Sequence, residues 1–479
     1  MRFGKVVCIY PYFREVPIYE FFPPIGLEYI AAAVEDLVDD VSVVDLRFEK
    51  DLHGILRNGA DMFCVSVNWH YEFHSVCELI RALPKDATTV VGGRHATANV
   101  QQLFDSCPNI DIIVRGDGEE TMREFVTSGS PENIEGLSYR RNGKVIHNAN
   151  RNLNAVSNTL FPNREARRYR YRISYQKVGL GYGVDSIVSS RGCPFGCRFC
   201  SFDRNPLGQR RTYSERTPES VLAELRRIRA KVIAFLDDNF FVNLKRAEEI
   251  CDLIIEEKLN KKLIVNARVS IGFQPRLLAK MYRAGFRLLM IGIESAQDKS
   301  LKSLDKGFTT ADVRNAFKEI RRSNMLTSGY FIVGIIGETK EDMIEIASFA
   351  QEIGLDLIHL NRLRFERYSG LGDLIEQNND YYVGDRSRVY SEAYGPKEML
   401  TILKRIRKEF FTYRKLVAIA FKAMRIGFPG WRFFLRMPIV LPRVAIRLLR
   451  RKKRRQQARR ALQLAVTSYP RQKPVSHGL

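Results

Sequence analysis

The sequence predicts an α/β protein: an N-terminal flavodoxin-like or Rossmann-like domain, a partial (β/α)6 barrel of the TIM type, and a basic helical C-terminal region. Two successive series of short β-branched runs alternate with amphipathic helical patterns, which is typical of parallel βαβ units. The second series begins beside three closely spaced cysteines. We expect the first domain at 1–133, a linker with a hairpin at 134–183, a core domain at 184–370 and the basic region at 371–479.

The N-terminal third contains five apolar runs that we expect to be strands, at 5–10, 41–46, 61–67, 87–93 and 111–115. Helical patterns separate them, and ligands of such a sheet bind at the carboxyl ends of its strands. Residues that follow three of these strands are candidate ligand contacts: Ser66, Asn68, Gly92, Gly93, Arg94, Gly116, Gly118 and Glu119. Glycine at such positions lets a bulky ligand approach the backbone. Tight turns of a Rossmann-like domain without a ligand would give the same pattern.

The alternation of strands and helices resumes after a connection. Asn142-Gly143 predicts the turn of a hairpin within the connection. We then expect six further strands, at 184–190, 231–236, 263–268, 288–295, 329–337 and 357–363. Thr217 as N-cap and Pro218 at the first helical position predict the helix that follows the first of them. Six parallel units predict a partial barrel whose active site lies at the carboxyl ends of the strands.

Cys193, Cys197 and Cys200 follow the first strand of this barrel and are candidate metal ligands. Three thiolates can bind three irons of a cubane 4Fe–4S cluster and leave the fourth iron open. Structural zinc sites normally have four protein ligands, and electron-transfer clusters use four cysteines. A run of three therefore indicates a cluster that does chemistry at its open iron. The alternative is three unrelated cysteines in a loop.

The remaining cysteines lie in apolar strand or helix contexts and are expected to be buried thiols: Cys8, Cys64, Cys77, Cys107 and Cys251. Such cysteine usage does not indicate a disulfide framework, so we expect a reducing compartment, the cytoplasm. No run of eighteen apolar residues predicts a transmembrane helix. The first residues resemble a buried strand more than a signal peptide.

The cysteine segment, with Phe199 before the last cysteine, resembles the CxxxCxxC motif of the radical S-adenosylmethionine (radical SAM) superfamily. The resemblance implies that SAM chelates the open iron and is cleaved to methionine and a 5′-deoxyadenosyl radical. It also implies SAM-binding roles for residues at the strand ends: Phe199, Asp237, Asp238, Asn239, Arg268, Glu294, Ser295, Gly334 and Gly337. Each acidic residue taken singly could instead be a solvated loop charge.

The N-terminal region, with Pro24-Ile25-Gly26-Leu27 and the glycines above, resembles the cobalamin-binding domain found ahead of many radical SAM cores. The resemblance implies cobalamin as a further cofactor. The Asp-x-His-x-x-Gly signature, whose histidine ligates cobalt in other cobalamin proteins, is absent after the first strand, which leaves loss of cobalamin open. His70, His74 and His95 are substitutes for that ligand, although a lone histidine more often packs or lies on the surface.

The basic charge is concentrated at the C-terminus. From 401 to 479 there are 22 Lys and Arg and one acid, Glu409, or +21 of the total +23. Cations alternate with bulky apolar residues over 401–461, which favours a peripheral segment on an anionic bilayer. An apolar helical cap followed by a disordered basic tail is an alternative. Nucleic-acid binding is another, which we disfavour because no RNA-binding domain pattern follows 400.

These observations favour a cobalamin-dependent radical SAM methyltransferase acting on an unactivated carbon of a hydrophobic, lipid-like substrate, by resemblance to the hopanoid methylases. A radical SAM cyclase or oxidoreductase without methyl transfer is the alternative, and a non-catalytic cobalamin or membrane sensor a remote one. We expect an electron donor such as flavodoxin or ferredoxin as a partner. We expect the protein in the cytoplasm, at the inner face of the membrane. The sequence names no radical-quenching residue.

Overall fold

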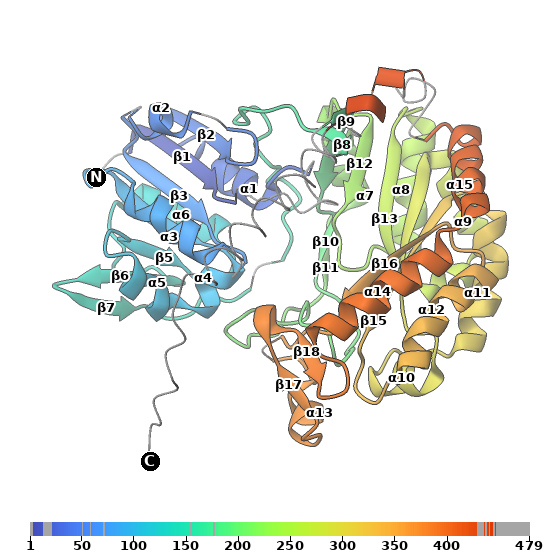
Figure 1. The fold of residues 1–479 in the computed structure, drawn as a ribbon. Coiled ribbons are helices and arrows are strands. Elements are labelled where there is room, and N and C mark those ends of the chain that lie inside the picture. The colour runs from blue at the N-terminus through green and yellow to red at the C-terminus, as the bar shows by residue number, and fades with distance from the viewer. Residues whose placement is uncertain are drawn as a thin grey trace, which may run out of the picture.

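The computed structural model describes residues 3–12, 22–49, 51–57, 59–69, 72–153, 155–175, 178–366 and 368–428, with a few isolated positions beyond. Two seven-stranded sheets, each flanked by helices, follow one another along the chain (Figure 1). They confirm the predicted α/β class with an open sheet ahead of a partial barrel.

The first sheet has the strand order β2-β1-β3-β4-β5-β6-β7. Its strands are β1 (Lys5–Tyr10), β2 (Asp40–Asp45), β3 (Met62–Ser66), β4 (Thr88–Gly92), β5 (Ile112–Val114), β6 (Leu137–Arg141) and β7 (Lys144–His147). β1 to β5 are parallel, and the hairpin β6–β7 adds two antiparallel strands at the edge. The hairpin predicted at Asn142-Gly143 is therefore present, and it extends this sheet. Both turn residues have positive φ, as the sequence Asn-Gly predicts.

Helices cover both faces of this sheet. They are α1 (Ile25–Val34), α2 (Leu52–Leu56), α3 (Phe73–Arg81), α4 (Arg94–Ala98), α5 (Val100–Ser106) and α6 (Glu119–Ser128). One apolar cluster joins α1 and α6 to the sheet, and another joins α2, α3 and α5 to the opposite face. Because both faces are covered, the parallel strands are nearly continuous apolar runs.

The second sheet has the order β16-β15-β14-β13-β12-β9-β8. Its strands are β8 (Arg172–Tyr175), β9 (Val178–Ile187), β12 (Val232–Phe235), β13 (Lys262–Arg268), β14 (Phe286–Glu294), β15 (Leu326–Val333) and β16 (Leu357–Arg362). Six of them are parallel, from β9 to β16, and β8 is antiparallel to β9. These are the six parallel units that the sequence predicts.

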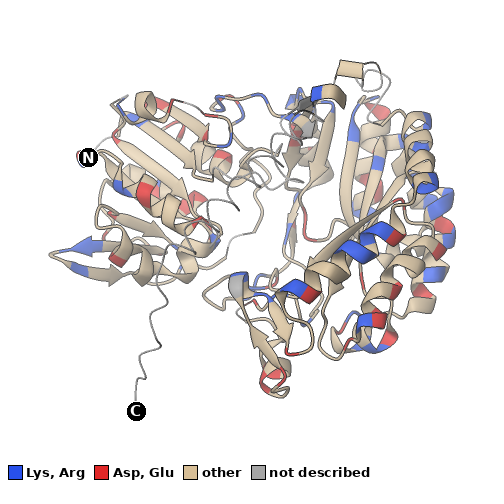
Figure 2. Ribbon diagram, viewed as in Figure 1, with Lys and Arg blue, Asp and Glu red and all other residues tan. Residues whose placement is uncertain are grey.

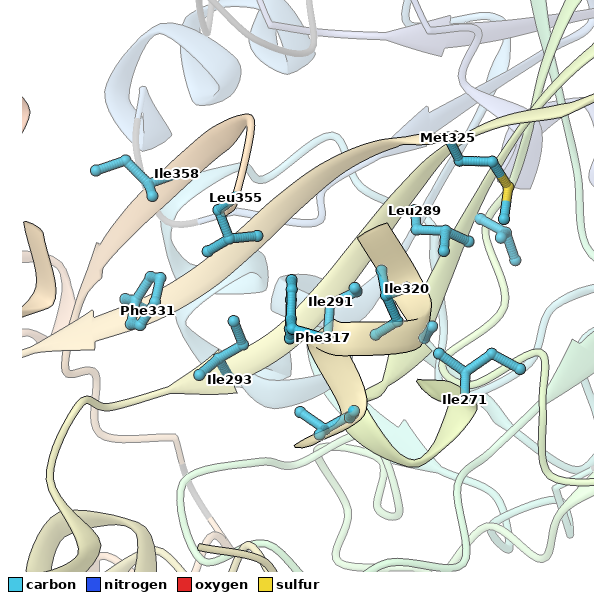
Figure 3. Close-up of a cluster of buried hydrophobic side chains, with 14 of the residues drawn as sticks. Ile271, Leu289, Ile291, Ile293, Phe317, Ile320, Met325, Phe331, Leu355 and Ile358 are labelled. Carbon is cyan, nitrogen blue, oxygen red and sulfur yellow. The ribbon is translucent and has the colours of Figure 1, made fainter. Parts of the chain in front are cut away.

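Helices on the outer face of this sheet enclose the main core. They are α7 (Pro218–Arg227), α8 (Leu244–Glu256), α9 (Pro275–Ala284), α10 (Asp298–Ser303), α11 (Thr310–Arg322) and α12 (Lys340–Glu352). Alternate residues of β14, such as Leu289, Ile291 and Ile293, meet Phe317 and Ile320 of α11 (Figure 3). Each of these side chains is fully buried and contributes roughly 1.5–3 kcal/mol relative to exposure.

The C-terminal helices complete the barrel. α14 (Pro396–Phe410) packs against α12, and α15 (Tyr413–Arg425) lies near the beginnings of the strands, where Ala423, Ile426 and Phe428 join an inner apolar cluster with Val232. Between β16 and α14 lie α13 (Gly372–Glu376) and the hairpin of β17 (Tyr381–Val383) and β18 (Val389–Ser391).

The basic region divides into two parts with different surroundings. The apolar residues of α14, such as Ile402, Ile406 and Phe410, are buried in the main core. Because α12 already covers this face, the part of the predicted membrane-facing segment 401–461 that lies on α14 is not free to contact a membrane. α15 instead leaves large apolar side chains exposed: Tyr413, Leu416, Val417, Phe421 and Met424. Most of the segment after 428 lies outside the described residues.

Lys and Arg are prominent on α14 and α15, as Figure 2 shows. Among the described residues, no helix has both the length and the apolar character needed to cross a membrane.

Candidate cluster, nucleotide and cofactor site

The three predicted cluster ligands lie on one loop that follows β9. The loop begins at the short ladder of β10 (Ser190–Arg191) and β11 (Ser214–Glu215). Gly192 has φ +82°, and its N–H donates to Asp238 Oδ2 at 2.9 Å. A side chain there would lie 3.2 Å from the carbonyl oxygen of Thr212, so the turn into the cysteines requires glycine.

All three cysteines are partly exposed and unbridged. Among the described residues, no three Cys, His, Asp or Glu side chains converge on one metal ion. Thiolates that bind separate irons of a cubane need no such convergence. Burial raises the pKa of Cys193 and raises that of Cys200 to about 12. Binding of iron to these thiols would therefore displace protons. The loop thus offers three sulfur ligands and no fourth.

Arg268 touches this loop directly. Its Nη1 lies 3.7 Å from Cys197 Sγ, and its guanidinium lies 3.7 Å from the centre of the Phe195 ring. Nη2 donates to the carbonyl of Lys306 at 2.6 Å. A fixed cation beside the sulfur stabilises negative charge on a thiolate or a bound cluster. The structure thus places this predicted SAM-binding residue against the cysteines.

Lys306 is a site residue that the sequence prediction missed, because no motif surrounds it. It is buried, and its Nζ lies 3.2 Å from Glu294 Oε1 and 5.5 Å from the centre of the Phe199 ring. Glu294 itself has φ +75°. For a residue other than glycine this is an uncommon conformation, and such strain gathers at functional sites. The ion pair joins the end of β14 to the aromatic residue of the cysteine motif.

The three polar residues after β12 have different surroundings. Asp237 is buried and accepts hydrogen bonds from Ser189 N at 2.7 Å, Ser189 Oγ at 2.5 Å and Ser190 Oγ at 2.8 Å. Its carboxylate therefore joins β12 to the start of the cysteine loop. Burial raises the pKa of Asp238 to about 6, although the hydrogen bond from Gly192 opposes this. Asn239 Oδ1 accepts from Phe241 N at 3.2 Å.

Glu338 organises the glycine-rich segment that follows β15, and sequence analysis did not name it as a site residue. Its two oxygens accept hydrogen bonds from Ser295 Oγ, Ser300 Oγ, Gly334 N and Ile335 N at 3.0–3.2 Å. Burial raises its pKa to about 7. Three residues predicted to contact SAM lie in this segment or beside it. Ser295 and Gly334 share the Glu338 carboxylate, and Gly337 N donates to the hydroxyl oxygen of Tyr381 at 2.8 Å.

A cavity of about 210 Å³ opens at the carboxyl ends of β3, β4 and β5. Seven of the ligand contacts that the sequence predicts line this cavity: Ser66, Asn68, Gly92, Gly93, Gly116, Gly118 and Glu119. Side chains such as Leu27, Ile30 and Val65 add apolar walls, and Asp117 and Arg191 add charge. This combination suits a flat apolar group with a polar edge.

Two glycines lie where the cavity wall is tightest. Gly93 has φ +108°, and a side chain there would lie 2.8 Å from the carbonyl oxygen of Val67. On Gly118 the new atom would meet Ile30 Cδ1 at 2.8 Å. Substitution at either position would narrow the cavity or move its wall.

Arg94 lies outside this lining. Its Nη2 donates to Ser201 Oγ, one residue after Cys200, at 2.7 Å. The histidines considered as cobalt ligands also lie elsewhere or outside the described residues. His74 is exposed and pairs with Glu78, His95 contacts Asn99 and Phe73, and His70 is not described. None of the described lining residues is histidine.

Comparison with family models finds the radical SAM superfamily at residues 187–350 and the B12 binding domain at 16–126. An uncharacterized methyltransferase of Pyrococcus horikoshii is 30% identical over 357 residues, which is 70% of this chain and 74% of that protein. The anaerobic magnesium-protoporphyrin IX monomethyl ester cyclase of Cereibacter sphaeroides is 29% identical, over 57% of this chain and 46% of its own length. The hopanoid C-3 methylase of Methylococcus capsulatus is 26% identical, over 63% and 59%.

A solved structure shares the fold. The radical SAM methyltransferase TsrM of Kitasatospora setae, with cobalamin and a [4Fe-4S] cluster bound, superposes with a TM-score of 0.63 at 19% identity. The match covers 80% of this chain and 81% of that one. The three-thiol loop fits a cubane with one open iron, and the glycine-walled cavity fits part of a corrinoid. The cofactors of this enzyme are accordingly a 4Fe–4S cluster, SAM and cobalamin. The chain belongs to the radical SAM superfamily, among the members that carry a B12-binding domain ahead of the radical SAM domain.

Proposed function

We propose that this enzyme transfers a methyl group to an unactivated carbon of a hydrophobic substrate. The observation that carries the proposal is the direct attachment of the cysteine loop to the wall of the glycine-lined cavity, by Arg191 on Glu119 at 2.5 Å. This attachment supports a site for reductive cleavage of SAM beside a site for a methyl carrier. The names of the relatives, an uncharacterized methyltransferase and a hopanoid methylase, support the same chemistry.

When bound, the cluster supplies one electron to SAM, and cobalamin carries the methyl group. The chain supplies the ligands and the fixed charges. We assign Cys193, Cys197 and Cys200 as ligands of three irons, which leaves the fourth for SAM. Arg268 Nη1 lies 3.7 Å from Cys197 Sγ, so this guanidinium would offset negative charge on the cluster.

For SAM itself we assign binding to residues of the cysteine loop and of the strand ends: Phe199, Asp238, Asn239, Arg268, Glu294, Ser295, Gly334 and Gly337. Asp238 suits the SAM ammonium group, because a partly buried carboxylate whose pKa is raised by desolvation prefers a cationic partner. Asp237 acts one step away, since its oxygens already hold Ser189 and Ser190.

The inner face of the barrel supports a substrate with an apolar or aromatic body. Arg268, Gly292, Tyr330 and His359 are aligned in register across β13 to β16. The rings of Tyr330 and His359 lie 5.1 Å apart. Burial lowers the pKa of His359, and Arg407 acts in the same direction, so a neutral imidazole faces this space near pH 7. We propose these two rings as substrate contacts.

Anaerobically reconstituted protein with SAM, hydroxocobalamin and a chemical reductant tests the function. We expect 5′-deoxyadenosine and S-adenosylhomocysteine together, and label from methyl-labelled SAM in the product. 5′-Deoxyadenosine without S-adenosylhomocysteine would favour the cyclase or oxidoreductase alternative, which the cyclase relative supports. Loss of the cluster absorbance in Cys197→Ala with the biological activity intact would favour a non-catalytic sensor. Replacing the chemical reductant by flavodoxin or ferredoxin tests the proposed electron donor.

We further propose that α15 attaches the enzyme to an anionic membrane surface, at the inner face where a reducing compartment keeps its eight cysteines as thiols. Tyr413 and Phe421 are 83% and 66% exposed on a helix that also contains Arg414 and Arg425. The chain after 428 adds 14 Lys and Arg and no acid. Each cation near an anionic surface contributes roughly 1 kcal/mol.

Cosedimentation with vesicles tests this attachment. We expect binding to vesicles that contain phosphatidylserine, weak binding to phosphatidylcholine alone, and loss of binding in Phe421→Ser with Leu416→Ser. A variant at a similarly exposed apolar residue away from α15, Phe273→Ser, is the control. Equal binding to both kinds of vesicle, or tighter binding to nucleic acid, would contradict the proposal.

A further inference from the structure

Arg191 connects two sites that the fold assigns to different domains. It lies in β10, two residues before Cys193, yet its side chain reaches the wall of the N-terminal cavity. Nη2 lies 2.5 Å from Glu119 Oε1, Nη1 lies 3.9 Å from Asp117 Oδ2, and the guanidinium lies 5.6 Å from the centre of the Tyr29 ring. The cavity is therefore incomplete without a residue of the core domain.

Two further contacts join the same elements. Arg211, which follows the cysteines, donates to Asp117 Oδ1 at 2.6 Å. Arg94, from the N-terminal domain, donates to Ser201 Oγ at 2.7 Å. We call the three contacts, Arg191–Glu119, Arg211–Asp117 and Arg94–Ser201, the loop clasp. The clasp holds the cysteine loop before its first cysteine and after its last one.

Backbone contacts link the position of Arg191 to the position of the first cysteine. Arg191 pairs with Ser214 in the β10–β11 ladder, and the next N–H, that of Gly192, donates to Asp238. The position of the Arg191 side chain thus depends on the same few residues that set the position of Cys193. On the other side, Glu119 is the first residue of α6 and lines the cavity together with Asp117 and Gly118.

We propose that the clasp couples the two cofactor sites thermodynamically, so that a formed cluster raises the affinity of the cavity for cobalamin, and bound cobalamin favours cluster assembly. A cluster fixes the cysteine loop and with it Arg191. Cobalamin then binds to a wall that is already ordered, which lowers the entropic cost of binding. Linkage requires the effect to be reciprocal. This coupling rests on the proposed cobalamin site, and its test is chosen to separate the two.

The experiment measures the dissociation constant of hydroxocobalamin by equilibrium dialysis with absorbance detection, on anaerobic apoprotein and on cluster-loaded protein. For the wild type we expect binding to tighten at least about fivefold when the cluster is present, the lower end of typical allosteric coupling. For Arg191→Met and Glu119→Gln we expect the two constants to agree within about twofold. A direct effect of Glu119→Gln on cobalamin contact appears in both protein forms and cancels in the ratio.

Arg123→Met is the matched control. Arg123 lies on the same helix as Glu119 and forms a bidentate pair with Asp36 at 2.6 and 2.8 Å, both within the N-terminal domain. We expect this variant to keep the wild-type ratio. The double variant Arg191→Met with Glu119→Gln should have the same ratio as either single variant, because all three remove the Arg191–Glu119 contact. Circular dichroism of each apoprotein checks that the fold is retained.

The outcomes separate the two ideas. Wild-type protein that binds hydroxocobalamin equally well with and without the cluster would keep the cobalamin site and overturn the coupling. A wild-type ratio that survives in Arg191→Met would overturn the role of the clasp. Wild-type protein that binds no hydroxocobalamin in either form would overturn the cobalamin site and the coupling together.

Discussion

Arg167 offers the sharpest test of how the two domains are held together. It lies in the connection between them and binds two buried carboxylates, one from each domain. Its Nε and Nη2 lie 2.5 and 2.6 Å from the oxygens of Glu28 in α1, and Nη1 and Nη2 lie 2.7 and 2.8 Å from those of Asp185 in β9. Replacement by Met keeps the apolar stem and removes the charge from both partners.

The loss of stability expected for Arg167→Met follows from the burial of its two carboxylate partners. Glu28 is 0% and Asp185 4% exposed, and removing one partner of a buried ion pair costs roughly 3–5 kcal/mol. Asp185 keeps Arg164 as a partner, with 3.3 Å between Nε and Oδ2, so Glu28 carries most of the loss. For a domain of this size the loss lowers the midpoint of thermal unfolding by roughly 6–20 °C at pH 8.

The pKa shifts of Glu28 and Asp185 determine the direction in which the stability of the variant changes with pH. Burial already raises the pKa of Glu28 despite Arg167, whereas the arginines hold the pKa of Asp185 below its ordinary value despite burial. Without Arg167 the pKa of Glu28 rises further above its unfolded value. The folded variant then binds a proton more readily than the unfolded chain, so its stability falls as pH rises through that raised pKa. Between the pKa of Glu28 in the folded wild type and its higher pKa in the folded variant, each pH unit increases the difference in free energy of unfolding by roughly 1.4 kcal/mol.

The assay is thermal unfolding of the apoprotein, followed by circular dichroism at pH 5, 6, 7 and 8. The control is Arg226→Met, which removes an ion pair of equal length, 2.5 Å to Glu257, whose partners are 50% and 40% exposed. Exposed pairs contribute roughly 0.2–1 kcal/mol, so the control should differ little from wild type. An Arg167→Met deficit no larger than that of the control, or one that does not grow with pH, would refute the reasoning.

Three further changes test the cofactor sites. Cys197→Ala should abolish the cluster absorbance of reconstituted protein; iron and sulfide retained at the wild-type ratio would contradict the assigned ligands. Gly93→Ala places a methyl group 2.8 Å from the carbonyl oxygen of Val67. It should weaken hydroxocobalamin binding at least tenfold, about 1.4 kcal/mol, in equilibrium dialysis. Gly143→Ala, whose added atom meets nothing within 4 Å, is the control. Glu338→Ala removes the acceptor of four hydrogen bonds and should lower the free energy of unfolding by about 3 kcal/mol. It should also weaken SAM binding measured by calorimetry. Unchanged SAM affinity would place this carboxylate outside the SAM site.

Sequence reasoning was strongest where one short segment carries the whole signal. The spacing of Cys193, Cys197 and Cys200 is local, and so is the alternation of strands and helices, which fixes the class of both sheets. The polar residues at the end of β3 and the glycines at the ends of β4 and β5 could be placed because the ends of neighbouring parallel strands meet at one edge.

What the sequence could not predict depends on contacts between distant segments. Asp237 and Asp238 are neighbours with the same chemistry, but only the fold shows that Asp237 is held by Ser189 and Ser190. Lys306 belongs to no motif and enters the site only because Glu294 lies opposite. Arg94 follows a predicted cavity glycine, yet its side chain crosses to Ser201, 107 residues away.

The ion pairs between the two domains differ in burial along the interface, and the difference has a functional meaning. The side chain of Arg167 is 10% exposed, and those of its partners Glu28 and Asp185 are 0% and 6% exposed, whereas Arg191 and Glu119 beside the cavity are 21% and 15% exposed. Charges at the drier contact cannot separate without leaving a carboxylate buried and unpaired, so that contact is rigid. Arg191 and Glu119 keep somewhat more access to water, so separating their charges leaves a less deeply buried carboxylate than at Arg167. The interface is therefore held more tightly at Arg167 than at the loop clasp, which lies beside the cofactor cavity.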